Sequence, residues 1–150
     1  MATPSTLDLQ SHPEPKRLAF YSALFAMSAA DRDMDESEDD RIFETLDLEG
    51  LSGEARKQVF QLAIQPPPLE RVLLEFRGDD LELRRALMLN LIDIVLADGI
   101  IEPGEHVGLH EARQVLGIDR DDMSDLHDLA HAIQSQQDVK RPVCPEPLSA

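Results

Sequence analysis

The stretch LMLNLIDIVLA, residues 87–97, is apolar on nearly every side, and ADGIIEPGE, residues 97–105, follows it directly. The apolar run is well short of the about 20 residues that a membrane-spanning helix needs, and it contains Asn90 and Asp93. It is therefore typical of a helix buried at the centre of a domain. Asp98 lies in the tight turn that follows, and Glu102 with Pro103 marks the start of the next helix.

The same arrangement occurs earlier in the chain. The stretch ADRDMDESEDD, residues 30–40, also follows an apolar helix pattern, and seven of its eleven side chains are carboxylates. Asp31 and Glu38 recur as Asp98 and Glu105 at one offset of 67 residues. Met34 and Ile101 hold the apolar place between them. The sequence therefore predicts two helix–acidic loop–helix pseudo-repeats.

Apolar residues at spacings of three and four predict an all-α fold with about seven helices. A chain of 150 residues is long enough for one domain with one core. We expect a single compact domain over 15–137, flanked by disordered arms over 1–14 and 138–150, which are rich in Pro and Ser. The expected helices cover approximately 15–30, 35–48, 52–64, 68–78, 80–97, 102–117 and 119–134.

Local signals set several of these boundaries. Ser52 is expected to cap the third helix, in which Val59, Phe60 and Ala63 point inward. The proline triplet at 66–68 breaks the chain and supplies the start of the fourth helix. Asp80 is expected to cap the fifth helix, and the seventh is expected to follow Asp119.

The pattern Asp-x-x-apolar-x-x-x-Glu between two helices, present twice, resembles the TerB-like family. That family includes the tellurite-resistance protein TerB and a related helical domain of DjlA-type co-chaperones. The resemblance covers residues 15–134 and is clearest at LADGIIEPGEHVGLHEARQVLGI, residues 96–118. It implies an all-α bacterial domain associated with stress or tellurite resistance, which binds metal ions through its acidic loops and has no established catalytic chemistry. The first copy departs from the second at Arg32, which stands where the second has Gly99.

The acidic loops are candidate sites for a divalent cation, because clustered carboxylates repel one another unless a cation, a proton or salt offsets their charge. Their oxygen donors favour calcium. The first loop is not an EF-hand, since Glu36 occupies the glycine position and Ile42 the position of the final Glu. A looser site remains. The candidate ligands are Asp31, Asp33, Asp35 and Glu38 in the first loop and Asp98, Glu102 and Glu105 in the second.

Helix capping is the alternative explanation for several of these carboxylates. Asp35 with Glu38, and Glu102 with Glu105, have the spacing of a capping box at a helix start. Negative charge there also complements the helix dipole. Capping leaves Asp31 and Asp33 as solvated turn residues without a structural role. Cation binding and helix capping therefore both stay open.

Net charge narrows the range of partners. Thirty acidic residues against fourteen basic ones give a net charge of −16, which repels nucleic acids and anionic membranes. Cations and proteins with a basic surface remain as partners. The first residues carry no basic segment followed by an apolar run, so no secretory signal is expected and the protein is predicted to be cytoplasmic. The oligomeric state cannot be inferred from the sequence.

Four histidines form two pairs on successive helices, His106 with His110 and His127 with His131. A helical hairpin that turned near Ile118 would bring the pairs level and could make a zinc site. The helical wheel places both pairs away from the apolar stripes, which favours exposed surface histidines.

Catalysis has little support in the sequence. Asp93 interrupts an apolar run, so it needs a partner such as Arg84, Arg85 or a backbone group. No nucleophile, glycine-rich phosphate loop or HExxH motif accompanies it. Cys144, the only cysteine, lacks a disulfide partner and is interpreted as an inert thiol.

Two functional hypotheses follow. The first is a non-enzymatic TerB-like domain whose acidic loops bind a divalent cation and thereby modulate a contact with a protein partner. The second is an acidic protein-interaction adapter in which the loop carboxylates only cap helices.

Overall fold

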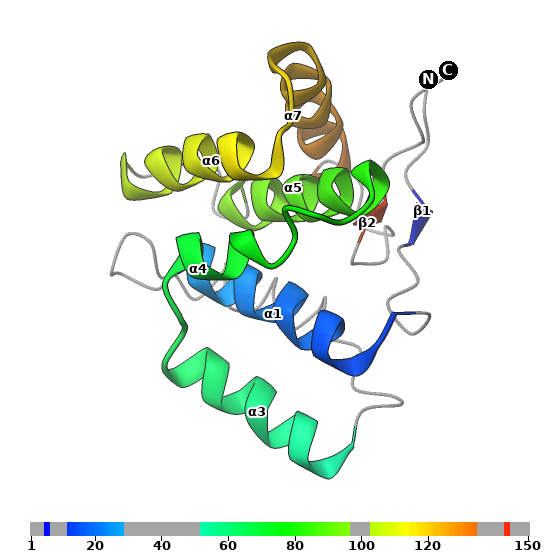
Figure 1. Ribbon diagram of the computed structural model, residues 1–150. Helices are drawn as coiled ribbons and strands as arrows, with labels where there is room; N and C mark the ends of the chain where they lie inside the picture. Colours follow the sequence, from blue (N-terminus) through cyan, green and yellow to red (C-terminus); the bar gives the residue numbers. More distant parts are fainter. Residues whose placement is uncertain (1–4, 7–11, 29–51, 97–102, 135–142, 145–150) are drawn as a thin grey trace.

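The architecture described by the computed structural model covers residues 5–6, 12–28, 52–96, 103–134 and 143–144 (Figure 1). Helices make up nearly all of it, which confirms the predicted all-α class. The predicted helix at 35–48 lies outside the described residues. The helices are α1 (Glu14–Ser28), α3 (Gly53–Ile64), α4 (Leu69–Leu74), α5 (Leu81–Val95), α6 (Pro103–Leu116) and α7 (Arg120–Gln134), and the strands are β1 (Ser5–Thr6) and β2 (Val143–Cys144).

Capping side chains explain where two of the helices begin. Ser52 precedes α3, and its hydroxyl accepts a hydrogen bond from the Ala55 amide at 3.1 Å. Asp119 precedes α7, and its carboxylate accepts a hydrogen bond from the Asp122 amide at 2.7 Å. The cap predicted at Ser52 is confirmed, and α7 follows Asp119 as predicted. The cap predicted at Asp80 is wrong, because Asp80 precedes α5 but its side chain makes no capping hydrogen bond.

The fourth helix is shorter than predicted. It ends at Leu74, four residues before Gly78. The amides of Glu75, Phe76 and Arg77 bond to carbonyls three residues earlier, as in a 3₁₀ turn. This tightened turn ends α4 before the glycine is reached.

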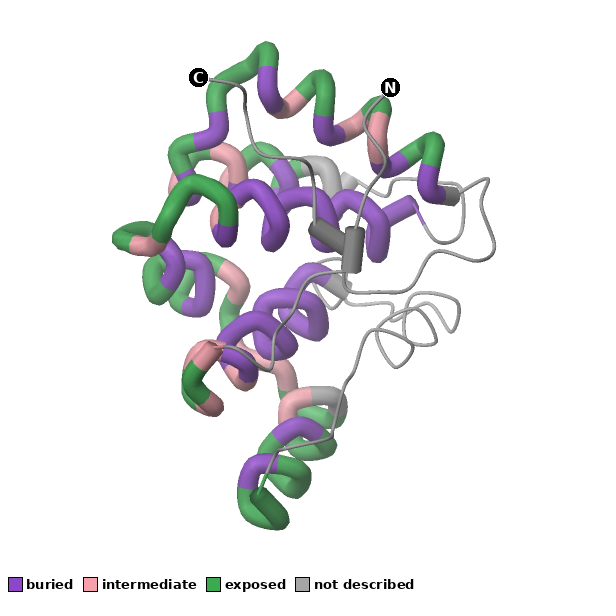
Figure 2. Tube along the Cα trace, turned by 90° about the vertical axis from the view of Figure 1, so that its right-hand side faces the viewer, coloured by how far each residue is buried: buried purple, intermediate pink, exposed green. Residues whose placement is uncertain are grey.

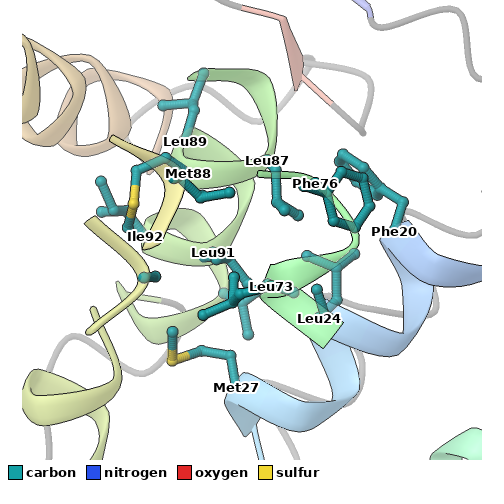
Figure 3. Packing of buried hydrophobic residues seen from close by; sticks show 14 of the residues in the cluster. Phe20, Leu24, Met27, Leu73, Phe76, Leu87, Met88, Leu89, Leu91 and Ile92 are labelled. Carbon is teal, nitrogen blue, oxygen red and sulfur yellow. The ribbon is translucent and has the colours of Figure 1, made fainter. Parts of the chain in front are cut away.

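Helix α5 lies at the centre of the fold. It is buried from Arg85 to Leu96 without interruption. Helices α1, α6 and α7 and strand β2 all pack against it, whereas α3 packs on α1, and α4 on α1 and α6. Figure 2 shows the resulting purple interior, and Figure 3 shows Phe20 and Leu24 of α1 facing Leu73 and Phe76 from the α4 segment and Leu87 and Leu91 of α5.

An internal repeat relates the two halves of the fold. Adding 67 to either end of α1 gives the corresponding end of α5, and adding 67 to the first residue of α3 gives the first residue of α7. The caps Ser52 and Asp119 correspond in the same way. The packing also corresponds, because α1 packs on α3 as α5 packs on α7. The predicted pseudo-repeat therefore extends from the acidic motif to whole helices.

The inward face of α3 differs from the prediction at Phe60, whose side chain is 52% exposed. Ala55 and Val59 are buried, and Leu62 is partly buried against the core. These residues are spaced by three and four and so share one helix face, whereas Phe60 lies about 100° away from Val59.

Strands β1 and β2 lie within the two segments predicted as disordered arms. They pair antiparallel, with Ser5 opposite Cys144 and Thr6 opposite Val143. Alternating apolar patterns could not predict them, because each strand has only two residues.

Lys16 ties the start of α1 to the end of α4. Its ammonium donates hydrogen bonds to the Glu75 carbonyl at 2.9 Å and to the Asp79 carboxylate at 2.7 Å. It also lies 4.7 Å from the ring centroid of Phe76, which is fully buried. One side chain therefore satisfies a free carbonyl at the end of α4 and covers a core aromatic ring.

The crossing of α1 and α6 depends on Gly108, which gives the first testable prediction. A Cβ at this position would lie 3.1 Å from Met27 Sδ and 3.3 Å from Leu69 Cδ2, and Met27 is fully buried. We expect Gly108→Ala to be less stable than Gly53→Ala by about 1–3 kcal/mol in urea unfolding. Gly53 is the matched control, because a Cβ added there meets nothing within 4 Å. Equal stability of the two variants would show that the crossing has room for a side chain.

Candidate functional site

Most of the predicted metal ligands lie outside the described residues. This holds for Asp31, Asp33, Asp35, Glu38, Asp98 and Glu102. Glu105 lies in the first turn of α6, where the backbone alone is described. The geometry of the candidate site is therefore the geometry of the helix ends from which the acidic segments leave.

Three of these helix ends lie together. Helices α1 and α5 run in the same direction in Figure 1, and α6 begins on the side where both end. The three helices pack on one another. The contact between Met27, one residue before the end of α1, and Gly108 in the first half of α6 fixes this arrangement. We call this region, where α1 and α5 end and α6 begins, the acidic end.

The helix dipoles at the acidic end differ in sign. The carboxyl ends of α1 and α5 carry partial negative charge, and both lead into segments with candidate ligands. A cation is favoured next to such ends. The amino end of α6 carries partial positive charge and favours a carboxylate. Because α6 begins at Pro103, Glu102 immediately precedes the helix and Glu105 holds its third position, as a capping box requires.

The described parts of α6 and α7 do not form the closely packed hairpin that a zinc site shared by the two histidine pairs would need. Helices α6 and α7 both pack on α5, but they are not among the helix pairs that pack closely. His110 and His131 are exposed and His127 is partly exposed. The side chain of His106 lies outside the described set. No group of three or more potential metal-binding His, Cys, Asp or Glu side chains occurs within the described part of the chain.

Buried charges lie away from the acidic end, where α5 meets α7. Arg85 Nε donates a hydrogen bond to Asp122 Oδ2 at 2.8 Å, and both side chains are 7% exposed. Asp122 Oδ1 has no hydrogen-bond partner. The positions related to this pair in the first half hold Leu18 and Ala55. The ion pair is therefore a feature of the second half alone.

Asp93, the buried carboxylate singled out by the sequence, is 1% exposed and is not without a partner. Arg84, one of the partners that the sequence offers for Asp93, donates hydrogen bonds to the carbonyls of Asp79 and Leu116 at 2.9 and 2.7 Å. The carbonyl of Leu116 ends α6, so Arg84 connects the start of α5 to the end of α6.

An open cavity of about 680 Å³ lies between α1 and α3. Its lining includes Leu18 and Ser22 of α1 and Gln58, Gln61 and Gln65 from the α3 segment. None of the described side chains that line it is ionisable. Among the described helices, none is long and apolar enough to cross a membrane.

These features define the class: an all-α domain of two related halves, in which an acidic segment follows each of two packed helices. The family model described as Tellurite resistance protein TerB matches residues 17–128, and the chain belongs to this family. The matched range contains both acidic segments. Comparisons with curated proteins and with solved structures gave no match.

The buried ion pair gives the second prediction. Asp122→Ala removes the carboxylate that Arg85 Nε binds inside the protein, so we expect a loss of about 3–5 kcal/mol in unfolding free energy. Arg85→Leu combined with Asp122→Ala copies the apolar pair of the first half and should recover most of that loss. Thermal and urea unfolding measure both. A double variant no more stable than Asp122→Ala would contradict the expected equivalence of the two halves.

Proposed function

We propose that this chain is a non-enzymatic TerB-family protein of the cytoplasm, associated with stress or tellurite resistance, whose acidic inter-helix loops bind a divalent cation. Cation binding then modulates a contact with a protein partner. The observation that supports this proposal is the contact between Met27 and Gly108, which brings the end of α1 to the start of α6.

Chain connectivity limits how far apart the candidate ligands can be. Asp31 follows Met27 by four residues, so the two Cα atoms are at most about 14 Å apart. Glu105 precedes Gly108 by three residues in the same helix, a rise of about 4.5 Å. Because Met27 and Gly108 nearly touch, the first acidic segment starts near the place where the second one ends. This supports the proposal that carboxylates from the two loops bind one ion.

The donor chemistry supports a hard cation. Calcium takes six to eight oxygen ligands from carboxylates, backbone carbonyls and water. The two loops contain seven candidate carboxylates, and the carboxyl ends of α1 and α5 add carbonyls that have no partner within their helix. A bound cation would offset both the repulsion between the carboxylates and the negative helix ends.

A second candidate function is an acidic protein-interaction adapter without a metal. The start of α6 at Pro103 favours it, because this start places Glu102 and Glu105 at capping positions. A basic protein surface would then bind the acidic loops directly.

Isothermal titration calorimetry distinguishes the two functions. We expect calcium to give a saturable heat, and magnesium, manganese and zinc are titrated in parallel. The absence of heat with all four ions at millimolar concentration would remove the cation hypothesis. Asp80→Asn is the matched control for Asp33→Asn, since Asp80 is exposed and lies outside both acidic segments. This control should bind calcium like the wild type.

Melting curves of Asp33→Asn give the third prediction. In the metal-free protein this change removes one of several repelling charges, so the melting temperature should rise. The same change should erase the stabilisation that calcium gives the wild type. For an ion at a hundred times its dissociation constant, that stabilisation is about 2.7 kcal/mol in unfolding free energy. A wild-type curve that does not move with calcium, together with an unchanged curve for Asp33→Asn, would contradict the proposal.

Asp35→Ala gives the fourth prediction, which tests capping. If Asp35 only caps a helix, its loss should lower stability by about 1 kcal/mol to the same extent with and without calcium. If it binds the ion, the loss should be larger in calcium than in a chelator. Unfolding in urea under both conditions measures the difference.

A further inference from the structure

The outward side of α3 combines apolar and basic residues, and we call Arg56, Lys57, Phe60 and Ile64 the α3 outer face. Phe60 is 52% exposed and Ile64 is 84% exposed. They lie four residues apart and so are neighbours on the helix surface. Arg56 and Lys57 are also exposed. This face is locally basic although the whole chain carries a net charge of −16.

The internal repeat shows that packing does not require the two apolar side chains. Phe60 and Ile64 correspond to His127 and His131 of α7 at the offset of 67 residues. Helix α7 packs on α5 as α3 packs on α1, yet it carries polar residues at these positions. Exposed apolar side chains that the fold does not need are typical of an interaction surface.

A complementary surface lies on α7. Asp121, Asp125 and Asp128 are exposed and spaced by four and three, so they line one side of the helix, and Ala132 is exposed on the same side. We call these four residues the α7 acidic side. Among the ion pairs of the described residues, none involves Asp125 or Lys57.

The spacing of the two surfaces matches. Lys57 precedes Ile64 by seven residues, and Asp125 precedes Ala132 by seven residues. A parallel alignment of the two helices that pairs Lys57 with Asp125 therefore also sets Ile64 against Ala132. The acidic row continues to Asp121, within reach of Arg56 in that alignment.

Helices α3 and α7 lie at opposite ends of the molecule in both views (Figures 1 and 2). The two surfaces therefore cannot meet within one chain. We propose that the α3 outer face of one copy docks on the α7 acidic side of a second copy, head to tail. Such a contact leaves one free surface at each end, so further copies can add.

The expected association is weak. One helix face against another buries less than the roughly 1,200–2,000 Å² of a stable interface, so the complexes are transient. Charges more than about 8 Å apart are largely screened at physiological ionic strength, so the contacting side chains act more strongly than the overall repulsion between two acidic chains.

Sedimentation velocity tests the proposal in 150 mM salt at rising protein concentration. The wild type should sediment faster as concentration rises, without stopping at a dimer. Lys57→Glu and Asp125→Lys should each weaken association about tenfold, because each replaces an attractive pair with a repulsive one. Lys57→Glu and Asp125→Lys in one chain restore an attractive pair and should restore association. Ile64→Glu should abolish it.

Arg71→Glu and Glu82→Lys are matched controls, since both residues are exposed and lie outside the two surfaces. They make the same charge changes and should associate like the wild type. Circular dichroism verifies that every variant is folded. A wild type that stays monomeric at all concentrations overturns the proposal. Continued association of Asp125→Lys, or a double variant that fails to recover, equally overturns the pairing of α3 with α7.

Discussion

Burial of α5 on every side is the constraint on which the rest of the structure depends. From Arg85 to Leu96 each residue of this segment is buried, so the helix needs partners all around it. Helices α1, α6 and α7 and strand β2 provide them. The polar groups within α5 must then be satisfied locally: Asn90 donates to the Ala86 carbonyl at 2.7 Å, and Arg85 pairs with Asp122. The acidic end exists because α6 must turn back along α5 and therefore starts where α5 and α1 end.

The internal repeat also shows what each half has added to a shared plan. Arg17 and Arg84 correspond, and both are followed at the same distance by a glycine, Gly50 and Gly117. In the second half this spacing places the arginine side chain at the carbonyl that precedes the glycine. Gly117 adopts φ 68°, a left-handed conformation that ends α6, and Arg84 binds the carbonyl just before it. Elsewhere the halves differ. Inside the protein, the second half has the Arg85–Asp122 ion pair where the first half has apolar residues. On the surface, the second half has histidines where α3 has Phe60 and Ile64.

Sequence periodicity predicted the helices well where a helix has one continuous apolar stripe. The boundaries of α3, α6 and α7 follow from Ser52, Pro103, Gly117 and Asp119, because capping and turn residues act locally. Phe60 was misplaced because an apolar side chain one position beyond the stripe looks the same in sequence as one within it. The predicted end of α4 was wrong because a 3₁₀ turn depends on packing and has no signature of its own in the sequence.

For the candidate site, the sequence named the carboxylates but could not show that the helix ends from which the two loops leave lie together. The proximity of these helix ends depends on α1 and α5 running in the same direction, and on a close contact between Met27 and Gly108. Neither residue carries a functional side chain, so no motif points to them. The close crossing at Gly108 depends on two helices at once, whereas a sequence motif describes only one segment of the chain.

The contact between α1 and α5 has a consequence for how the chain folds during synthesis. Corresponding residues of the two helices are 67 positions apart, so α1 emerges from the ribosome long before α5, one of its two principal packing partners. Phe20, Leu24 and Phe25 are all fully buried in the folded protein, and among the described helices that pack on α1, α3 and α4 are the two made before α5. The two related halves therefore share one core, which is complete only after the second half has been made.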